Sequence, residues 1–184
     1  VVITRVPRDD LPDAGAALFA ATIRAVRETL PAARIELLIP DLRGEEAPLL
    51  TILNARPDIL GHNIETVARL YGLRPGADYR RSLAVLRLSK SLSADTRTKS
   101  ALMLGMGETT QEVVSALEDL RGAGCDFLAL GQYLAPSRDH EPVHAYVAPE
   151  EFEDYRRRAL RLGFRHVESG PYVRSSYRAD AYSE

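Results

Sequence analysis

Polar side chains that could bind a ligand or transfer protons recur directly after the apolar stretches of this 184-residue chain. The set combines hydroxyls, carboxylates, amides, imidazoles, guanidiniums and glycines: Thr4, Arg8, Asp9, Asp10, Asp41, Arg43, His62, Asn63, Glu65, Gly105, Gly107, Glu108, Gln132, Ser137, Arg138, His140, Arg174, Ser175 and Ser176. Together these groups suit a polar ligand that carries amino, carboxylate and ribose groups. Any one of them alone is more often a turn or capping residue, so the set rather than a single member indicates a binding site.

The stretch Gly105-Met106-Gly107-Glu108 is the most distinctive part of this set. Two glycines at the end of a buried strand let backbone amides approach a ligand, and Glu108 could accept a hydrogen bond from a hydroxyl. Glycines also end strands for steric reasons, and a phosphate-binding loop would have more glycines or a following Lys and Ser or Thr. The stretch by itself therefore leaves both interpretations open.

His62 and Cys125 are interpreted as structural residues. No second histidine or cysteine lies at metal-ligand spacing from His62, so a hydrogen-bonded structural role is favoured over a metal site. Cys125 is the only cysteine, which excludes an internal disulfide and a thiolate cluster built by this chain alone. Its place between a helical pattern and a strand predicts a small buried side chain rather than a reactive thiol.

Short apolar runs alternate with segments of helical period, and these elements must position the polar residues. We predict strands at residues 1–4, 35–40, 58–63, 99–107, 127–134 and 164–170, and helices at 15–30, 47–55, 65–72, 79–92, 109–124 and 149–162. Thr109 and Glu112 have the spacing of a capping box. Continuously apolar strands separated by helices indicate a parallel α/β sheet, whose carboxyl edge would gather the polar residues. Periodicity does not distinguish an open doubly wound sheet from a barrel.

The composition predicts one globular domain over residues 1–184, because 45% of the residues are hydrophobic and 27% are charged. A net charge of -2 provides no general attraction to nucleic acid or to an anionic membrane. No apolar run is long enough to cross a bilayer and no secretory signal is present, so we expect a cytoplasmic protein. The chain opens on an apolar run at Val1, and we expect a fragment whose N-terminal part is missing.

Several stretches, in order along nearly the whole chain, resemble the lipoyl synthases, a family of radical S-adenosylmethionine enzymes. They are VVITRVPRDDLPDAGA, IELLIPDLRG, GHNIETV, RPGADYRRSL, TKSALMLGMGETTQEV, LGQYLAPSRDHEPV and GPYVRSSYRAD. LGQYLAPSR and GPYVRSSY are specific to this family rather than to radical enzymes in general. The resemblance implies a partial (β/α) barrel of the radical S-adenosylmethionine type, open on one side and truncated at its N-terminus.

The resemblance also implies an activity, cofactors and partners. The activity is the insertion of two sulfur atoms at C6 and C8 of a protein-bound octanoyl group, with S-adenosylmethionine and two [4Fe–4S] clusters as cofactors of the whole enzyme. The implied partners are octanoylated lipoyl carrier domains or the glycine cleavage carrier protein, together with an electron donor protein. Neither nucleic acid nor a membrane is implied.

By the same resemblance, site residues carry over onto matching positions. Asn63, Glu65, Gly105, Gly107 and Glu108 are implied at the S-adenosylmethionine pocket, Thr4 and Asp10 at its methionyl end, and Tyr133, Ser137 and Arg138 on the substrate side. Ser175, with Ser176 as the alternative, is implied as an oxygen ligand of the auxiliary cluster. An alkoxide matches iron less well than a thiolate, so this iron would be released more easily when the cluster gives up sulfur. No catalytic side chain is assigned.

Three departures from the family pattern affect these expectations. The family's Cys-x3-Cys-x2-Cys motif and its second cysteine triplet have no counterpart, so we expect no cluster on this chain alone and no activity from it alone. Both triplets precede the strand at which this chain begins, which favours truncation over degeneration. Arg5 and Pro7 replace a small hydroxyl and an acid near the expected amino-binding strand end, and Arg81 stands where an aromatic is common.

Two other functions remain open at this point. A catalytically inactive relative could bind octanoylated carrier or S-adenosylmethionine without reacting. Alternatively, an ordinary (β/α) enzyme could use Glu65, Glu108 or Asp10 for acid–base chemistry on a small metabolite. The second alternative leaves the RSSY and LGQYLAPSR stretches without a role.

Overall fold

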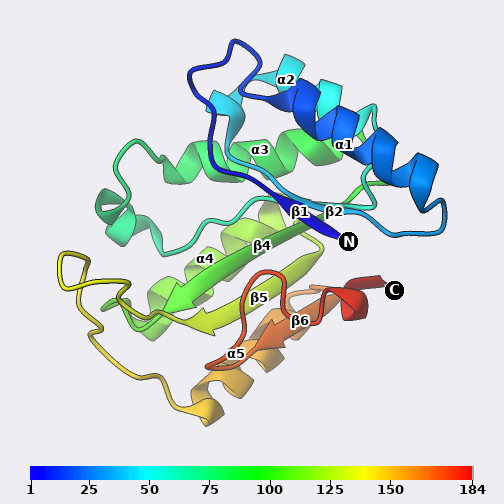
Figure 1. Ribbon diagram of the computed structural model, residues 1–184. Coiled ribbons are helices and arrows are strands. Elements are labelled where there is room, and N and C mark those ends of the chain that lie inside the picture. The colour runs from blue at the N-terminus through cyan, green and yellow to red at the C-terminus, as the bar shows by residue number, and fades with distance from the viewer. Residues whose placement is uncertain (184) are drawn as a thin grey trace.

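The computed structural model describes residues 1–183 and shows one curved, fully parallel sheet with helices on its outer side (Figure 1). The strands are β1 (Val2–Thr4), β2 (Glu36–Leu38), β3 (Ile59–Gly61), β4 (Arg97–Leu104), β5 (Phe127–Gln132) and β6 (His166–Ser169). The α-helices are α1 (Ala16–Thr29), α2 (Glu46–Leu53), α3 (Tyr79–Leu92), α4 (Thr110–Gly122) and α5 (Pro149–Arg161). Short 3₁₀ helices are η1 (Leu42–Gly44), η2 (Ala68–Leu73) and η3 (Ala179–Ser183). No helix in residues 1–183 is both long and apolar enough to span a bilayer.

The strand order decides between the two parallel architectures. Each strand pairs with the next one in the chain, from β1 to β6. A doubly wound sheet reverses its order at a switch point, whereas sequential right-handed crossovers keep all helices on one face and curve the sheet into a barrel wall. In the described residues β1 and β6 each have a single neighbour. The predicted partial (β/α) barrel is therefore confirmed.

Most predicted helices and strands are present, with strands shorter than predicted. The capping box at the start of α4 is confirmed: the Glu112 amide donates to Thr109 Oγ1 at 3.3 Å, and Glu112 Oε2 accepts from the Thr109 amide at 2.8 Å. The helix predicted at residues 65–72 was wrong. The Glu65 amide donates to the Ala101 carbonyl at 3.0 Å and the Met103 amide donates to the Glu65 carbonyl at 2.8 Å. Pairing with β4 thus uses the backbone groups that a helix would need, and only η2 follows.

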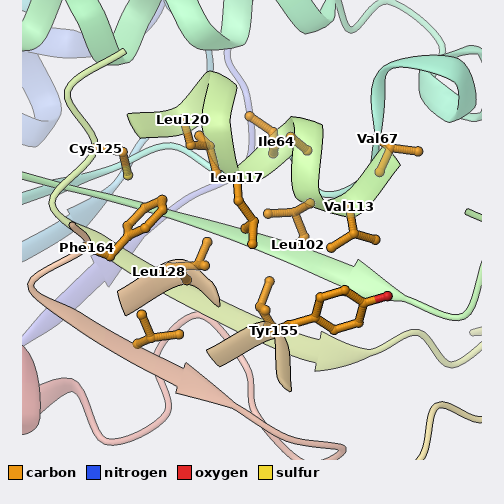
Figure 2. Packing of buried hydrophobic residues seen from close by; sticks show 14 of the residues in the cluster. Ile64, Val67, Leu102, Val113, Leu117, Leu120, Cys125, Leu128, Tyr155 and Phe164 are labelled. Atoms are coloured by element: carbon orange, nitrogen blue, oxygen red, sulfur yellow. The ribbon is translucent and has the colours of Figure 1, made fainter. Parts of the chain in front are cut away.

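The hydrophobic core lies between the helices and the outer face of the sheet. Figure 2 shows its larger part, where Leu102 and Leu128 from β4 and β5 meet Leu117 and Leu120 from α4 and Tyr155 from α5. A second cluster joins α1 and α2 to β2 and β3 through Phe19, Ile23, Leu37, Ile52 and Leu60. Both clusters lie on the outer face, which leaves the inner face for other contacts.

The chain's own C-terminal segment, defined here as residues 170–183 and drawn in red in Figure 1, returns over part of the inner face of the sheet. Alternate residues of β4 and β5 point inward and are small at mid-sheet: Val173 packs on Ala101 and Ala129. A Cβ on Gly131 would lie only 2.2 Å from the Val173 carbonyl oxygen. Small side chains on these two strands therefore make room for the returning segment.

Candidate ligand-binding site

A cavity of about 540 Å³ opens at the carboxyl ends of β1, β2 and β3, within the size range of small-molecule sites. Its lining includes Thr4, Arg5, Asp41, His62, Asn63, Glu65 and Arg74. A larger cavity of about 1050 Å³ lies at the amino ends of the strands, around Val2, Glu36 and Arg97. Parallel β/α architectures place chemistry at the carboxyl ends, so we assign the candidate site to the smaller cavity.

Asn63 and Glu65 form the polar centre of this cavity. The Asn63 side-chain amide donates to the Glu65 carboxylate at 3.1 Å. Glu65 has a φ of 63°, an uncommon conformation for a non-glycine residue, and its hydrogen bonds to β4 hold it there. Burial raises the pKa of Glu65, although the Asn63 bond opposes this shift. The result is a pre-positioned carboxylate that a ligand hydroxyl could satisfy.

His62 is a buried, hydrogen-bonded histidine, as the sequence predicts, and its Nε2 is an unpaired acceptor. Its Nδ1 lies 3.0 Å from the Ile39 carbonyl oxygen, which requires a proton on Nδ1. Burial lowers the pKa of His62, so the ring is neutral and Nε2 carries a lone pair. Nε2 is buried and has no hydrogen-bond partner among the described residues. Since an unsatisfied buried acceptor is unfavourable, Nε2 suits an N–H or O–H donor of a ligand.

Two arginines that the sequence did not single out as site residues lie at this cavity, Arg74 in its lining and Arg81 in contact with lining residues. Arg74 lines the cavity, donates to the Ile64 carbonyl at 3.2 Å and lies over the ring of Tyr71. Arg81 Nε binds Asp41 Oδ2 at 2.5 Å, and its Nη2 donates to the Gly76 carbonyl at 2.6 Å. The two partners of this ion pair are 40 positions apart, so no local pattern indicated it. Arg81 thus connects the loop after η2 to the end of β2.

Of the two residues predicted at the methionyl end, the structure places only Thr4 in the cavity lining. Asp10 is exposed and accepts hydrogen bonds from Arg8 at 2.7 and 2.6 Å, and this contact lowers the pKa of Asp10. Arg5 and Pro7 both line the cavity. The Arg5 guanidinium contacts the Ala14 carbonyl and lies over the Phe19 ring, where it occupies the space beside Gly15.

The glycine loop after β4 closes on itself through Glu108. The amides of Gly105 and Met106 donate to the Glu108 carboxylate at 2.5 and 2.9 Å. Gly105 has a φ of 100°, and a Cβ there would lie 2.3 Å from the Ala145 carbonyl oxygen. Gly107, with a φ of 97°, has the His144 ring 3.4 Å from the Cβ position. Close packing of residues 133–148 explains the glycines, and a ligand contact by Gly105, Gly107 or Glu108 stays a prediction.

The three residues predicted on the substrate side share one loop, residues 133–148, which is separate from the cavity lining. Tyr133 is buried and its hydroxyl donates to the Glu141 carbonyl at 2.8 Å. Ser137 Oγ lies 2.9 Å from His140 Nδ1, and Arg138 is exposed. Gln132, one of the polar residues predicted after the strands, fixes the loop. Its side chain donates to the Ala145 carbonyl and accepts from the Val147 amide, both at 2.9 Å.

Ser175 and Ser176 lie on the C-terminal segment that returns over part of the inner face. Ser175 is half-buried and Ser176 is exposed. They follow buried Val173, whose carbonyl accepts a 2.7 Å hydrogen bond from Arg174 Nη1. Ser175 is thus the less exposed of the two serines.

Comparisons with known proteins address which family combines these features. No family model matches the chain. It is 58% identical to a lipoyl synthase of Geotalea uraniireducens over 182 residues, 99% of this chain, and 57% identical to a lipoyl synthase of Citrifermentans bemidjiense over 184 residues. Over nearly its whole length the chain is similar to lipoyl synthases. The resemblance predicted from the motifs is confirmed.

The chain spans 64% and 63% of the length of these two lipoyl synthases. Among solved structures, methylornithine synthase (PylB) superposes with a TM-score of 0.61 at 15% identity, over 88% of this chain and 56% of that one. At this level of identity the likeness concerns the fold alone. It agrees with the partial barrel described above.

The resemblance to lipoyl synthases implies two kinds of cofactor, and the described residues fit one of them. The cavity offers a carboxylate, an amide, an imidazole acceptor and a guanidinium, which suit S-adenosylmethionine. An iron–sulfur cluster needs several thiolates. Residues 1–183 contain no group of three or more His, Cys, Asp or Glu residues placed to hold a metal. Cys125 is buried, and burial raises the pKa of its thiol to about 12. A cluster therefore does not fit these residues alone.

Proposed function

We propose that this chain forms the S-adenosylmethionine-binding wall and the serine-bearing C-terminal segment of a lipoyl synthase. The whole enzyme would insert two sulfur atoms at C6 and C8 of a protein-bound octanoyl group. Identity of 58% to a named lipoyl synthase over nearly the whole chain supports the proposal. The main structural support is the cavity at the carboxyl edge, whose lining contains the half-buried side chains of Asn63 and Glu65 and the buried His62, whose Nε2 is unpaired.

In this proposal the cavity residues bind and orient S-adenosylmethionine. Glu65 accepts a hydrogen bond from a ribose hydroxyl, and Asn63 keeps the carboxylate in position. The Arg74 guanidinium provides positive charge for the ligand carboxylate, and Thr4 lies at the methionyl end. His62 Nε2 accepts from a ligand N–H or O–H. Binding in the cavity excludes water from the bound part of the ligand, while the cofactors supply the radical and sulfur chemistry.

The two [4Fe–4S] clusters of the proposed reaction require cysteines that this chain does not contain. We propose that the 184 residues alone are inactive and that Ser175 ligates the auxiliary cluster in the whole enzyme. Octanoylated lipoyl carrier domains or the glycine cleavage carrier protein are the proposed substrates, and an electron donor protein is the proposed source of electrons. The proposed location is the cytoplasm.

A catalytically inactive relative is the alternative function. The cavity lining contains no cysteine, and the single cysteine of the chain is buried, so the described residues provide ligand-binding groups without a cluster site. Such a relative would bind S-adenosylmethionine or the octanoylated carrier through the same residues without reacting. General acid–base catalysis is less well supported, because Glu108 is occupied by loop amides and Asp10 by Arg8.

Anaerobic iron and sulfide reconstitution of the full-length gene product tests the proposal, with the 184-residue chain as the control. We expect two clusters in the full-length protein, none in the 184-residue chain, and sulfur insertion into an octanoylated carrier domain by the former. A full-length protein that binds no cluster but binds S-adenosylmethionine would instead support the non-catalytic relative. Loss of S-adenosylmethionine binding in Glu65→Ala, with binding kept in the exposed control Glu46→Ala, would place the ligand in the cavity.

A further inference from the structure

The C-terminal segment is held on the inner face at two points, one on each side of the serines. The first is Val173, which is buried against Ala101 and Ala129. The second is Tyr182, which is 1% exposed and packs with Ile59 and Phe127. Residues 174–181 between these points are mostly exposed.

Tyr182 is seated in a site made of three elements. Its ring centroid lies 5.4 Å from that of Phe127 on β5 and 4.9 Å from that of His166 on β6, in edge-to-face arrangements. Lys99 Nζ on β4 lies 3.5 Å from the centroid of the Tyr182 ring. Aromatic pairs and a desolvated cation–π contact of this kind are among the stronger side-chain interactions.

The cation beneath the ring belongs to a buried ion pair. Lys99 Nζ lies 2.9 and 3.1 Å from the two carboxylate oxygens of Glu36 on β2, and the side chains of Lys99 and Glu36 are 2% and 6% exposed. Burying two charges is costly unless other groups replace the lost water. The face of the Tyr182 ring does so for Lys99, so the ion pair and the aromatic ring each favour the position of the other.

The serines depend on these two points for their position. Between them the described contacts are weak or local: the Tyr177 amide donates to the Arg174 carbonyl, the Ala181 amide donates to the Arg178 carbonyl, and Arg178 lies 3.6 Å from Glu168. A segment with few buried contacts opens locally at low cost. Release of either end would therefore free the whole segment.

We propose that Tyr182 is a positioning residue: by docking on the Lys99–Glu36 ion pair it holds residues 174–181, and with them Ser175, against the inner face of the sheet. Its detachment frees the serine-bearing segment while the sheet stays folded. The docking follows from the contacts above, whereas its consequence for a cluster rests on the proposed function of Ser175.

Hydrogen exchange on the full-length protein without clusters tests the docking itself. The reporters are the hydrogen-bonded amides of Tyr177 and Ala181, compared with amides in β4. For Tyr182→Ala we expect the two reporters to exchange at least about tenfold faster with β4 unchanged, and for Tyr182→Phe we expect nearly wild-type exchange, because the ring is kept. Tyr172→Ala is the matched control, since Tyr172 lies in the same segment and is 88% exposed.

Equal exchange of the reporters in wild type and Tyr182→Ala would overturn the proposal, as would faster exchange throughout β4. If Tyr182→Ala does not fold, the double variant Glu36→Gln, Lys99→Met tests the same docking. It removes both charges, leaves no unpaired ion and keeps the aromatic ring, and we expect intermediate acceleration of the two reporters. Unchanged exchange in the double variant would show that the ion pair does not support the docking.

Loading the full-length protein with clusters separates the docking from the proposed function. If Ser175 is a ligand, Ser175→Ala and Tyr182→Ala both alter the Mössbauer spectrum of the auxiliary cluster, and Tyr182→Phe restores it. If Tyr182→Ala accelerates exchange of the reporters but neither Tyr182→Ala nor Ser175→Ala changes the spectrum, the docking is supported. The same result would overturn the proposed role of Ser175 as a ligand.

Discussion

The Asn63 side-chain amide donates a 3.1 Å hydrogen bond to the Glu65 carboxylate, two residues along the chain and at the rim of the same cavity. This contact orients the carboxylate before a ligand binds. Because Glu65 is also partly removed from water, its charge is less stable in the folded chain than in solution, and this desolvation raises its pKa. The charge of Glu65 therefore reduces the stability of the fold, whereas we expect ligand binding to depend on it.

Glu65→Gln is expected to stabilise the fold at neutral pH and to weaken S-adenosylmethionine binding. Because the pKa of Glu65 is raised in the folded state, protonated Glu65 stabilises the fold relative to the charged form. This contribution is complete below the unfolded pKa of about 4.3 and is lost as pH rises through the folded pKa. Neutral glutamine avoids that loss, so we expect a melting temperature about 2 to 4 °C higher at pH 7.5 and little change at pH 4. Affinity in the cluster-loaded full-length protein should fall by about tenfold or more. Thermal scans and calorimetric titration measure both, and a lower melting temperature at pH 7.5 would contradict the argument.

His62→Asn is expected to weaken S-adenosylmethionine binding with little effect on folding. Asparagine can still donate to the Ile39 carbonyl, as His62 Nδ1 does at 3.0 Å, but it lacks an acceptor at the position of Nε2. Loss of one hydrogen bond to the ligand should reduce affinity by about 3- to 10-fold. His62→Gln, which can reach the Nε2 position, is the comparison variant. Equal affinity in wild type and His62→Asn would show that water, not the ligand, satisfies Nε2.

Gly131→Ala is expected to destabilise the fold by about 1 to 3 kcal/mol, because the added methyl group overpacks the inner face. The new Cβ would lie 2.2 Å from the Val173 carbonyl oxygen and 3.2 Å from Arg174 Nη1. Gly122→Ala is the matched control, since its Cβ would meet nothing within 4 Å, and it should be neutral or stabilising by up to about 1 kcal/mol. Urea unfolding curves distinguish the two. Equal midpoints would mean that the C-terminal segment moves away freely.

The Cys125 thiol is expected to resist alkylation in the folded protein. Burial raises its pKa to about 12, so at pH 8 only about one molecule in 10⁴ carries a thiolate. Labelling by iodoacetamide followed by mass spectrometry should be slow in the native state and fast after unfolding in guanidinium. Complete labelling of native protein within minutes would be incompatible with this burial.

The start of α4 is expected to lose stability in acid. Arg69 binds Glu112 at 2.6 Å and, with the Thr109 amide, lowers the pKa of Glu112 to about 2. Because the pKa of Glu112 is lowered in the folded state, charged Glu112 stabilises the fold. This contribution is present above the unfolded pKa of about 4.3 and is lost as pH falls toward 2. Arg69→Met should raise the Glu112 pKa in an NMR titration, whereas Arg80→Met, on α3, should not. An unchanged Glu112 pKa in Arg69→Met would assign the shift to the Thr109 amide alone.

The local elements and the resemblance to lipoyl synthases could be predicted from the sequence because their signals lie within a few residues of one another. The capping box of Thr109 and Glu112 depends on a spacing of three, and Asn63 and Glu65 are separated by two. Motifs such as GHNIETV and GPYVRSSY are likewise contiguous. Strand and helix patterns then predicted that polar residues after β1 and β3 would meet at one edge, and the cavity contains Thr4, Asn63 and Glu65.

The tertiary structure alone decided the contacts between distant positions. Asp41 and Arg81 are 40 residues apart, and Glu36 and Lys99 are 63 residues apart. The sequence around one partner therefore does not indicate the other. The backbone of Glu65 pairs with β4 instead of starting a helix, because strand hydrogen bonds outweigh a local helical pattern. Long-range packing likewise brings Tyr182 onto Lys99.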